Sequence, residues 1–314
     1  MAGALQPAKR VLDVVIVGGG PAGLSAALVL GRCRRRVLLC DTGRPRNGAA
    51  TELHGYLTRD GIPPRELLRL GREELRPYGV ELREVAVEDV VCQPDSFDVR
   101  LATGERIATR KILVATGVRD HLPDIEGLDA CYGISVHHCP YCDGWEERDR
   151  RLAVIGHGAS AAGLALSLKT WSEEVTVCTL GRARVSTRHR AQLDEQHIAL
   201  VEGPIARFEH ERGRVRRLVT SRGQQVACDA VFFSTGQSPQ WDLPQRLGCE
   251  ITRKGTIKTD LLGQTRVPGF YVVGDASRDV QFVIVAAAEG AKAGVAINKA
   301  LQARAGLAAA PAQP

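Results

Sequence analysis

Residues 11–17 form an almost continuous apolar run, VLDVVIV, which is typical of a parallel strand that is buried on both faces. The run ends at the glycine-rich stretch GGGPAG, and the following run, LSAALVLG, indicates a helix. A second apolar run, Val37–Cys40, ends at Asp41. The pattern predicts a strand–helix–strand unit with a tight turn between its first strand and its helix.

This turn has the glycine spacing of a dinucleotide-binding loop. Gly18 permits the tight turn, Gly20 lets a pyrophosphate approach the backbone, and Gly23 lets the helix pack on the strand. Asp41 is placed to accept a hydrogen bond from a ribose hydroxyl. Because strand, helix, glycines and acidic residue are in register, we expect the first unit to bind a dinucleotide.

The same pattern returns later in the chain. The run LAVIG is followed by the glycine-rich stretch GHGASA, the helical run AAGLALSLK and a strand predicted over residues 175–180. The residues of this second loop are Gly156, His157, Gly158, Ala159, Ser160 and Ala161. Ala161 replaces the third glycine, and Thr179 and Leu180 stand where an acidic residue is usual. The second unit therefore either holds an unusual dinucleotide or is a packing domain without one.

Three further apolar runs end at or near a glycine, over residues 111–117, 232–236 and 270–275, and the last precedes an Ala-rich helix predicted over 281–304. Together these elements predict an α/β fold with two Rossmann-like domains of the three-layer ββα type, the second inserted in the first. We expect residues 1–117 and 245–314 to form the discontinuous first domain. The inserted domain is predicted over 118–244.

Composition narrows the function classes. The chain has 314 residues, 25% of them charged, and a net charge of +6 that comes from arginines scattered among glutamates, so we do not expect nucleic-acid binding. No segment has the ~20 apolar residues needed to span a bilayer, and the first apolar run opens a nucleotide unit instead of a signal peptide. With nine cysteines, an odd number, we expect mostly free thiols in a reducing cytoplasm.

The stretch HHCPYCDGWE places two thiols, Cys139 and Cys142, directly after His137 and His138. A zinc site normally needs four ligands, and the chain has no second CxxC or HxxxH, so we expect no metal. A redox-active disulfide and two inert buried cysteines both remain open from the pair alone. In the redox case, the second thiol resolves a mixed disulfide, and a helix starting just after Cys142 would lower the thiolate pKa.

Over essentially its whole length, the chain resembles the low-molecular-weight thioredoxin reductase family of flavoproteins. The resemblance rests on GGGPAG with Asp41, VATG at 114–117, CPYCDG at 139–144, GHGASA at 156–161 and VVGDA at 272–276. In the glutathione-reductase type the redox cysteines follow the first strand–helix unit, whereas here CxxC opens the inserted domain. The position of the motif therefore indicates the low-molecular-weight type.

The resemblance implies FAD in the first domain and a redox role for the Cys139–Cys142 pair. In that family's pattern Cys142 faces the flavin, Cys139 exchanges with the substrate, and Asp143 is the acid. Gly274 and Asp275 contact the ribityl-phosphate region. The residues implied to contact FAD are Gly18, Gly20, Pro21, Ala22, Gly23, Asp41, Arg46, Asn47, Val87, Ala115, Thr116, Gly117, Gly274, Asp275, Gln281 and Phe282.

The chain departs from the family where NADPH is bound. The usual His-Arg-Arg after the second strand of the inserted domain aligns with Thr179, Leu180 and Gly181. The nearest arginines stand at shifted positions, from Arg182 to Arg190. The departure makes NADPH a doubtful donor and suggests ferredoxin or a second flavin in its place. It identifies the chain as a member of a divergent branch.

The expected activity is that of an FAD-dependent disulfide oxidoreductase acting on a thioredoxin-like protein or a small-molecule disulfide. Two alternatives stay open: a dithiol oxidase that passes electrons to oxygen, and a redox sensor without turnover. The resemblance also implies a homodimer, which is the commonest symmetric assembly.

Overall fold

A computed structural model describes residues 11–253, 255–277 and 280–306 and divides the chain into two compact units. Unit 1 holds the residues up to Arg46, Arg65–Arg119 and those from Ser238 onward. Unit 2 holds Asn47–Pro64 and Asp120–Gln237. The main part of unit 2 thus runs from Asp120 to Gln237, whereas the sequence predicts an inserted domain over 118–244. The segment Asn47–Pro64, which the sequence places in the first domain, groups with unit 2 instead.

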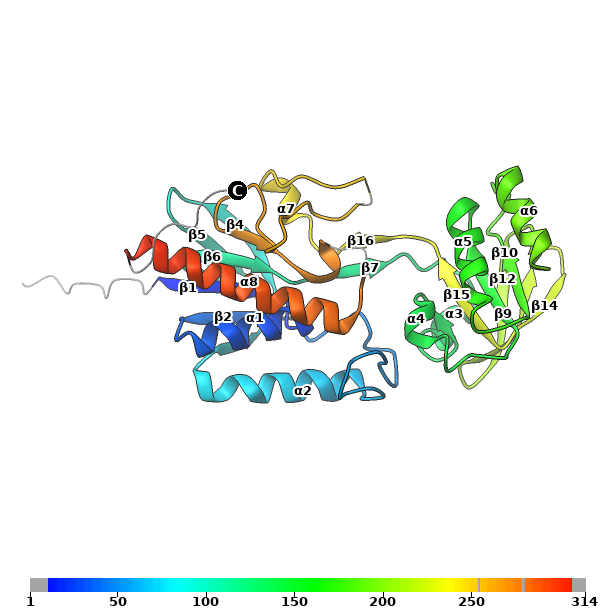
Figure 1. Cartoon of the computed structure of the whole chain (residues 1–314), viewed down its shortest axis with the longest axis horizontal. Helices are drawn as coiled ribbons and strands as arrows, with labels where there is room; N and C mark the ends of the chain where they lie inside the picture. Colours follow the sequence, from blue (N-terminus) through cyan, green and yellow to red (C-terminus); the bar gives the residue numbers. More distant parts are fainter. Residues whose placement is uncertain (1–10, 254, 278–279, 307–314) are drawn as a thin grey trace, which may run out of the picture. The chain divides into compact units, whose positions relative to one another are not determined.

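Unit 1 is built on a seven-stranded sheet of order β3-β2-β1-β6-β5-β4, in which β17 also pairs with β6 (Figure 1). The strands β3, β2, β1, β6 and β17 pair in parallel, whereas β5 pairs antiparallel with both β6 and β4. Its strands are β1 (Leu12–Val17), β2 (Val37–Asp41), β3 (Glu81–Glu84), β4 (Val87–Cys92), β5 (Phe97–Leu101), β6 (Arg106–Val114) and β17 (Phe270–Val272). Its helices are α1 (Pro21–Arg32), α2 (Pro64–Leu75), η1 (Arg76–Tyr78), α7 (Leu243–Arg246), η2 (Gly274–Ala276) and α8 (Val283–Arg304).

Successive residues of β1 face opposite layers, as the strand period of two requires. Ile16 belongs to a buried cluster with Leu30 of α1 and Ile297 of α8. Val15 belongs to a second cluster that includes Phe97 of β5 and residues of β4 and α7. The sheet is therefore covered on both faces, which is why β1 is apolar almost throughout.

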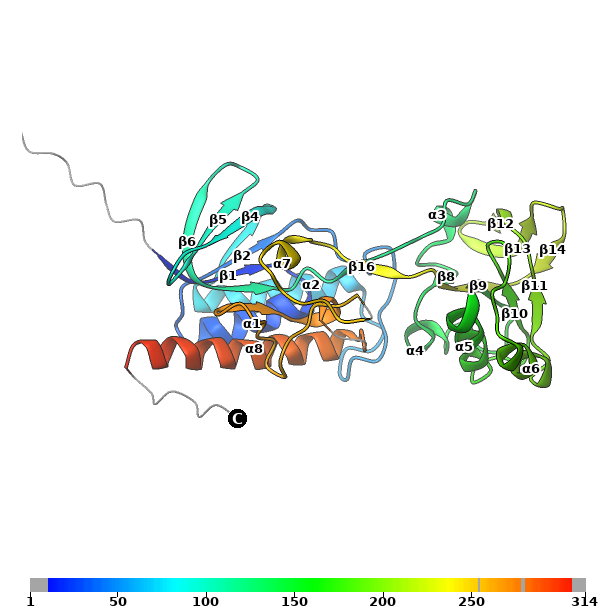
Figure 2. The same ribbon diagram turned by 90° about the horizontal axis from the view of Figure 1, so that it is seen from above.

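The helices α1 and α8 lie side by side on one face of this sheet (Figures 1 and 2). Their contact depends on small residues, because a Cβ added at Gly290 would stand 2.0 Å from the backbone oxygen of Ala22. One turn later, a Cβ at Gly294 would stand 3.1 Å from Val29. The backbones approach more closely than any side chain at Gly290 would allow.

Unit 2 repeats the three-layer plan with a parallel sheet of order β11-β10-β9-β15-β8. The helices α5 and α6 cover one face, and an antiparallel sheet of β12, β13 and β14 covers the other. Its strands are β8 (Val136–His137), β9 (Leu152–Gly156), β10 (Val175–Cys178), β11 (Ala199–Val201), β12 (Ile205–Glu211), β13 (Arg214–Thr220), β14 (Gln225–Ala227) and β15 (Ala230–Ser234). Its helices are α3 (Leu128–Cys131), α4 (Pro140–Asp143), α5 (Gly158–Leu168) and α6 (Thr187–Glu195).

The chain passes between the units in β7 (Val118–Asp120) and β16 (Gln237–Pro239). Both units have the predicted parallel α/β architecture, so the fold class is confirmed. Within the described ranges, no helix combines the length and apolarity that crossing a membrane requires.

Replacing Gly290 by Ala should destabilise unit 1, because the new methyl group meets the backbone of α1. Overpacking of this kind costs about 1–3 kcal/mol of unfolding free energy. The matched control is Gly163→Ala in α5, where no atom lies within 4 Å of the added Cβ and higher helix propensity should stabilise by up to ~1 kcal/mol. Urea unfolding followed by circular dichroism measures both, and equal effects of the two substitutions would contradict the packing argument.

Candidate flavin and disulfide sites

The turn after β1 is closed by backbone contacts that admit no side chain. Gly18 has φ 105°, and a Cβ there would lie 2.4 Å from the Ala115 backbone oxygen. A Cβ at Gly23 would lie 1.9 Å from the Gly18 oxygen. At Gly20, by contrast, an added Cβ meets no described atom within 4 Å. Gly18 and Gly23 are therefore required by the fold itself, whereas Gly20 keeps a space open above the turn.

That open space lies at the start of α1. The helix has Gly20 at its N-cap and Pro21 in its first turn, and no side chain of the described chain caps it. The first amides of a helix lack partners within the helix, and the helix dipole is positive there. An anion such as a pyrophosphate is the group that this end of α1 suits.

Asp41, at the end of β2, lies beside the same turn. Its Oδ2 would be 2.6 Å from a Cβ at Gly19, and it accepts a hydrogen bond of 2.7 Å from Arg72 Nη2 on α2. The guanidinium holds the carboxylate in place next to the loop. Asp41 thus lies where the sequence predicts the acceptor for a ribose hydroxyl.

A second group of predicted residues meets around Arg46. Its Nη1 donates to Asp275 Oδ2 at 3.0 Å and to Gln281 Oε1 at 2.6 Å. The backbone amide of Gly274 donates to Glu289 Oε2 at 2.8 Å. Gln281 Nε2 is buried and has no hydrogen-bond partner among the described atoms. A buried donor without a partner costs about 1–3 kcal/mol, so a cofactor oxygen at this position fits the site.

The other residues predicted to contact FAD lie in several different parts of the structure. Ala115 follows β6, and its amide donates to Val17 O at 2.8 Å, with Thr116 and Gly117 next along the chain. Phe282 is the N-cap of α8. Val87 begins β4 and is buried in the core of unit 1, and Asn47 opens the segment that groups with unit 2. Asn47 is thus not brought together with the others within unit 1.

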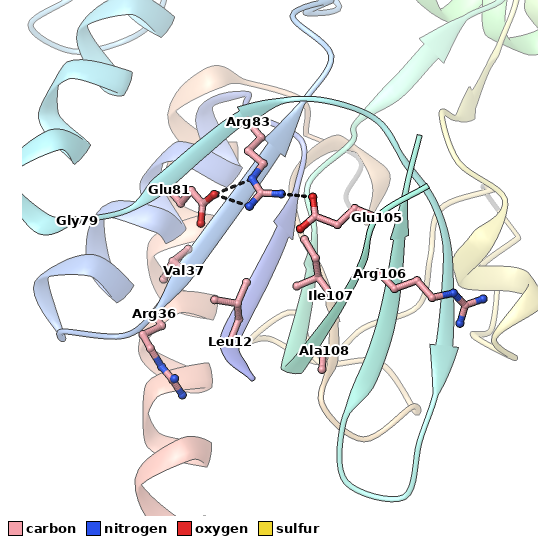
Figure 3. Close-up of a pocket in the computed structure, with 10 residues that line it drawn as sticks. All are labelled: Leu12, Arg36, Val37, Gly79, Glu81, Arg83, Glu105, Arg106, Ile107 and Ala108. Carbon is pink, nitrogen blue, oxygen red and sulfur yellow. Dashed lines mark hydrogen bonds and ion pairs between the residues drawn. The ribbon is translucent and has the colours of Figure 1, made fainter. Parts of the chain in front are cut away.

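Unit 1 also has a pocket of about 690 Å³ at the opposite ends of its strands (Figure 3). Leu12, Val37 and Ile107 line it, each at the beginning of a strand. Nucleotides bind beyond the carboxyl ends of the strands in such sheets. The guanidinium of Arg83 is already paired with Glu81 and Glu105, at 2.6 and 2.7 Å. The other two arginines that line it, Arg36 and Arg106, pair with Asp13 and Asp98, at 3.6 and 2.9 Å. The position of the pocket and the pairing of its arginines therefore do not favour it as the nucleotide site.

In unit 2, Cys139 and Cys142 form a disulfide with Cα atoms 5.3 Å apart. The short helix α4 begins at Pro140, with Cys139 as its N-cap, so the predicted helix start after Cys142 is wrong. Pro140 explains the shift, because its ring suits the first position of a helix. Both cysteines are partly exposed.

The other seven cysteines, all among the described residues, are free thiols, and five of them are buried. Burial raises the pKa of Cys40, Cys178 and Cys228 to about 12. These thiols stay protonated at neutral pH and are poor nucleophiles. The Cys139–Cys142 disulfide is partly exposed, unlike these thiols. In the described part of the chain, no cluster of three or more His, Cys, Asp or Glu side chains is arranged to hold a metal ion.

A buried histidine lies behind the disulfide. His137 Nδ1 is 3.4 Å from Asp143 Oδ1, and its Nε2 is 3.4 Å from Glu147 Oε1. Burial opposes the charged form, but the hydrogen bonds and charges of these two carboxylates outweigh it and raise the pKa of His137 to about 9. The sequence identified Asp143 and missed Glu147, although its spacing of four from Asp143 matches one helical turn.

Aromatic side chains surround the same turn. Trp171 packs under Gly144, where a Cβ would stand 2.7 Å from the indole. Tyr141 meets Trp171 edge-on with ring centroids 5.4 Å apart. Tyr141 is 68% exposed and Trp145 is 64% exposed. Two apolar rings are thus presented to solvent next to the disulfide.

The second glycine-rich loop, Gly156–Ala161, is partly closed by the chain itself. The amide of Gly158 donates to Ala183 O at 2.8 Å, and the amide of Ala183 donates to Glu202 Oε2 at 3.2 Å. The Thr179 hydroxyl is buried and bonded to the backbone of Gly181, and it accepts from the Gly203 amide at 3.3 Å. The Gly158 amide of the loop and the hydroxyl of Thr179, which aligns with the nucleotide-binding sequence, are therefore engaged by contacts within unit 2.

The known proteins that this chain resembles include disulfide oxidoreductases of one family. A family model described as pyridine nucleotide-disulphide oxidoreductase matches residues 12–290. The chain is 30% identical to a probable thioredoxin reductase of Arthroderma benhamiae, over 88% of this chain and 76% of that protein. The crystal structure of a protein named HlmI is 38% identical, with a TM-score of 0.87 over 93% and 92% of the two chains. A putative thioredoxin reductase, TrxB of Bacillus anthracis, is 30% identical, with a TM-score of 0.88 over 94% and 99%.

Gly20→Val should abolish flavin binding while leaving the fold intact. Gly20 has φ −74°, which any residue adopts, and its Cβ points into open space, so the side chain obstructs only the approach of a pyrophosphate. Absorbance of the purified variant measures flavin content, and its melting curve should match that of wild-type protein stripped of flavin. Full flavin occupancy in the variant would show that the cofactor does not use this loop.

Proposed function

Since the chain belongs to the pyridine nucleotide-disulphide oxidoreductase family and is an FAD-dependent disulfide oxidoreductase of the thioredoxin reductase type, we propose that it moves electrons between FAD and the Cys139–Cys142 pair. Through that pair the electrons pass to or from a protein or small-molecule disulfide. The observation that carries the proposal is the disulfide itself. It is the pair within reach of solvent, in a chain whose buried thiols have raised pKa values.

Two groups of residues in unit 1 would hold different parts of the cofactor. The loop Gly18–Gly23 and the start of α1 would hold the pyrophosphate, and Asp41 would hold a ribose. Asp275 and the unpartnered Nε2 of Gln281 would hold polar atoms of the remainder. Bound FAD would supply one-electron and oxygen chemistry, which the cysteine pair does not supply by itself.

We assign the exchange with flavin to Cys142 and the exchange with substrate to Cys139, as the family resemblance implies. A thiolate of one cysteine attacks or leaves, and the spacing of the pair lets the second thiol resolve the mixed disulfide. Asp143 follows Cys142 directly and is partly exposed, so it is positioned to move a proton to or from the pair.

We place the electron donor outside the pyridine nucleotides. A 2′-phosphate needs positioned arginines, yet Thr179, Leu180 and Gly181 stand at those positions. The Glu202 carboxylate faces the second loop through its bond from Ala183, and Arg190 lowers its pKa, which keeps it negative. Because Glu202 pairs with Arg190 at 3.0 Å, that guanidinium is already engaged and is less available to a phosphate. Ferredoxin, a second flavin or a dithiol entering through Cys139 remain as electron sources.

A second candidate is oxidation of a small dithiol with electrons passed to oxygen. The exposed rings of Tyr141 and Trp145 support it, because aromatic faces beside the disulfide suit a substrate with an apolar, planar part. The same rings are also compatible with a thioredoxin-like partner, because Tyr and Trp are enriched in protein interfaces. We further propose a homodimer, as the family resemblance implies.

Two serine substitutions test the assigned roles of the cysteines. Cys139→Ser should leave Cys142 as a lone thiolate beside oxidised flavin and produce a long-wavelength charge-transfer absorption band. Cys142→Ser should lack the band and leave Cys139 open to alkylation by iodoacetamide. The matched control is Cys33→Ser, an exposed thiol outside the motif, whose spectrum should equal that of the wild type. A band in the Cys142→Ser variant alone would reverse the assignment.

NADPH should reduce the flavin poorly. Each lost charged hydrogen bond costs about 1.5–3 kcal/mol, so the absence of two arginines weakens binding by on the order of a hundredfold or more. Anaerobic stopped-flow mixing with NADPH, NADH or reduced ferredoxin measures flavin bleaching, with dithionite as the control for a reducible flavin. Complete reduction within seconds at micromolar NADPH would show that Arg182, Arg184 or Arg188 restores the missing contacts. Oxygen uptake on adding a dithiol in air would favour the oxidase.

A further inference from the structure

His137 lies on β8 behind the redox turn and is held from both sides. Its side chain is 8% exposed, and its two ring nitrogens each face a carboxylate, Asp143 Oδ1 and Glu147 Oε1, at 3.4 Å. The Phe232 ring of the neighbouring strand β15 packs against the imidazole with centroids 5.4 Å apart. The ring therefore has a fixed orientation, with one nitrogen toward each acid.

The carboxylates connect the histidine to two different surroundings. Asp143 adjoins Cys142 and its side chain is 23% exposed, so it lies at the redox turn. Glu147 is buried, with a side chain 4% exposed, and its second oxygen accepts from Arg150 Nη1 at 2.7 Å. Arg150 is 42% exposed. A series of hydrogen-bonding groups thus runs from Asp143, the residue after Cys142, through His137 and Glu147 to Arg150 at the surface.

The charges around His137 favour its protonated form. Among the described residues, the charged groups that face it are Asp143 of α4 and Glu147 of the following turn, with Arg150 behind Glu147. Although burial opposes the charge, the two acids raise the pKa of His137 to about 9. The imidazolium is therefore present at neutral pH and is lost as the pH rises through about 9. A neutral histidine would leave two carboxylates close together without the cation between them.

We propose that His137 is the proton reservoir of the Cys139–Cys142 pair, a role that rests on the redox function proposed above. When the pair accepts two electrons, the S–S bond breaks, one sulfur remains a thiolate, and the other takes one proton. That proton leaves Nδ1 of His137 and reaches the sulfur through the Asp143 carboxylate, and solvent then restores it to the imidazole. Oxidation of the dithiol releases the two electrons and returns the proton along the same path. His137 and Glu147 are positioning residues, because they act through Asp143.

The test uses the flavin-containing protein and its His137→Gln and Glu147→Gln variants, with Glu174→Gln, an exposed acid of the same unit, as the control. The disulfide is reduced with a phosphine between pH 7 and 10, and the thiols at Cys139 and Cys142 are counted by mass spectrometry after an acid-quenched alkylation. We expect the rate of disulfide reduction in the wild type to be constant from pH 7 to about pH 9 and to fall at higher pH. Glu147→Gln should move that fall at least about one pH unit lower, because the imidazolium loses one of its acids.

His137→Gln should react about tenfold or more slowly at pH 7, in the range expected when a proton donor is lost, and should lack the fall at high pH. An NMR titration of the histidine ring protons gives an independent readout, in which His137 should titrate about one unit or more lower in Glu147→Gln than in wild type. The exposed His210 is the internal reference in the same spectra.

A wild-type rate and pH profile in His137→Gln would overturn the proposal, as would an NMR titration of His137 that Glu147→Gln leaves unchanged. If His137→Gln does not fold, Glu147→Gln alone decides. Failure of the proposed redox function is a separate outcome: the flavin would stay oxidised while Cys139 and Cys142 are reduced, whatever the pH profile shows.

Discussion

Three backbone segments approach the turn between β1 and α1 more closely than side chains would allow, and the organisation of unit 1 depends on that approach. Ala115 after β6 lies against Gly18, the Gly18 oxygen lies against Gly23, and Ala22 lies against Gly290 of α8. A methyl group at any of these glycines would separate the strand, the helix and the C-terminal helix from one another. Because the glycines carry no side chains, the amides at the start of α1 remain available, and Gly20 faces open space above them. The packing that holds the unit together therefore also keeps open the start of α1, where we propose that the pyrophosphate of FAD binds.

Unit 2 has a similar fold, but its notable side chains lie at a different place from the glycine-rich loop. The Gly158 amide of its glycine-rich loop donates to Ala183 O, whereas His137 lies at the end of β8 and the disulfide lies at and in α4. There the disulfide is partly exposed, and a buried imidazole between two acids stands directly behind it. In our account the first unit carries the flavin, and the second carries the disulfide and its proton supply.

The sequence predicted most of this arrangement where the signal was local. Continuous apolar runs identified β1, β9 and β15, and glycine spacing identified the turn at Gly18–Gly23, since those features depend on neighbouring residues. Strand ends were less accurate: β10 ends at Cys178 and not at residue 180, because Thr179 turns its hydroxyl to the backbone of Gly181. Other contacts join residues that the sequence gives no reason to connect. They are those of His137 with its two acids, of Arg46 with Asp275, and of Gly158 in the second loop with Ala183. Such contacts depend on tertiary packing, which periodicity does not encode.

We propose that the flavin and the Cys139–Cys142 pair exchange electrons within one protein. An anaerobic titration with dithionite, followed by the flavin spectrum, tests it most directly, in the wild type and in a variant with both cysteines replaced by serine. We expect the wild type to consume one more electron pair per flavin than the variant before the flavin is fully reduced. Equal consumption by the two proteins, with both flavins fully reduced, would show that the disulfide does not share electrons with the flavin and would contradict the account.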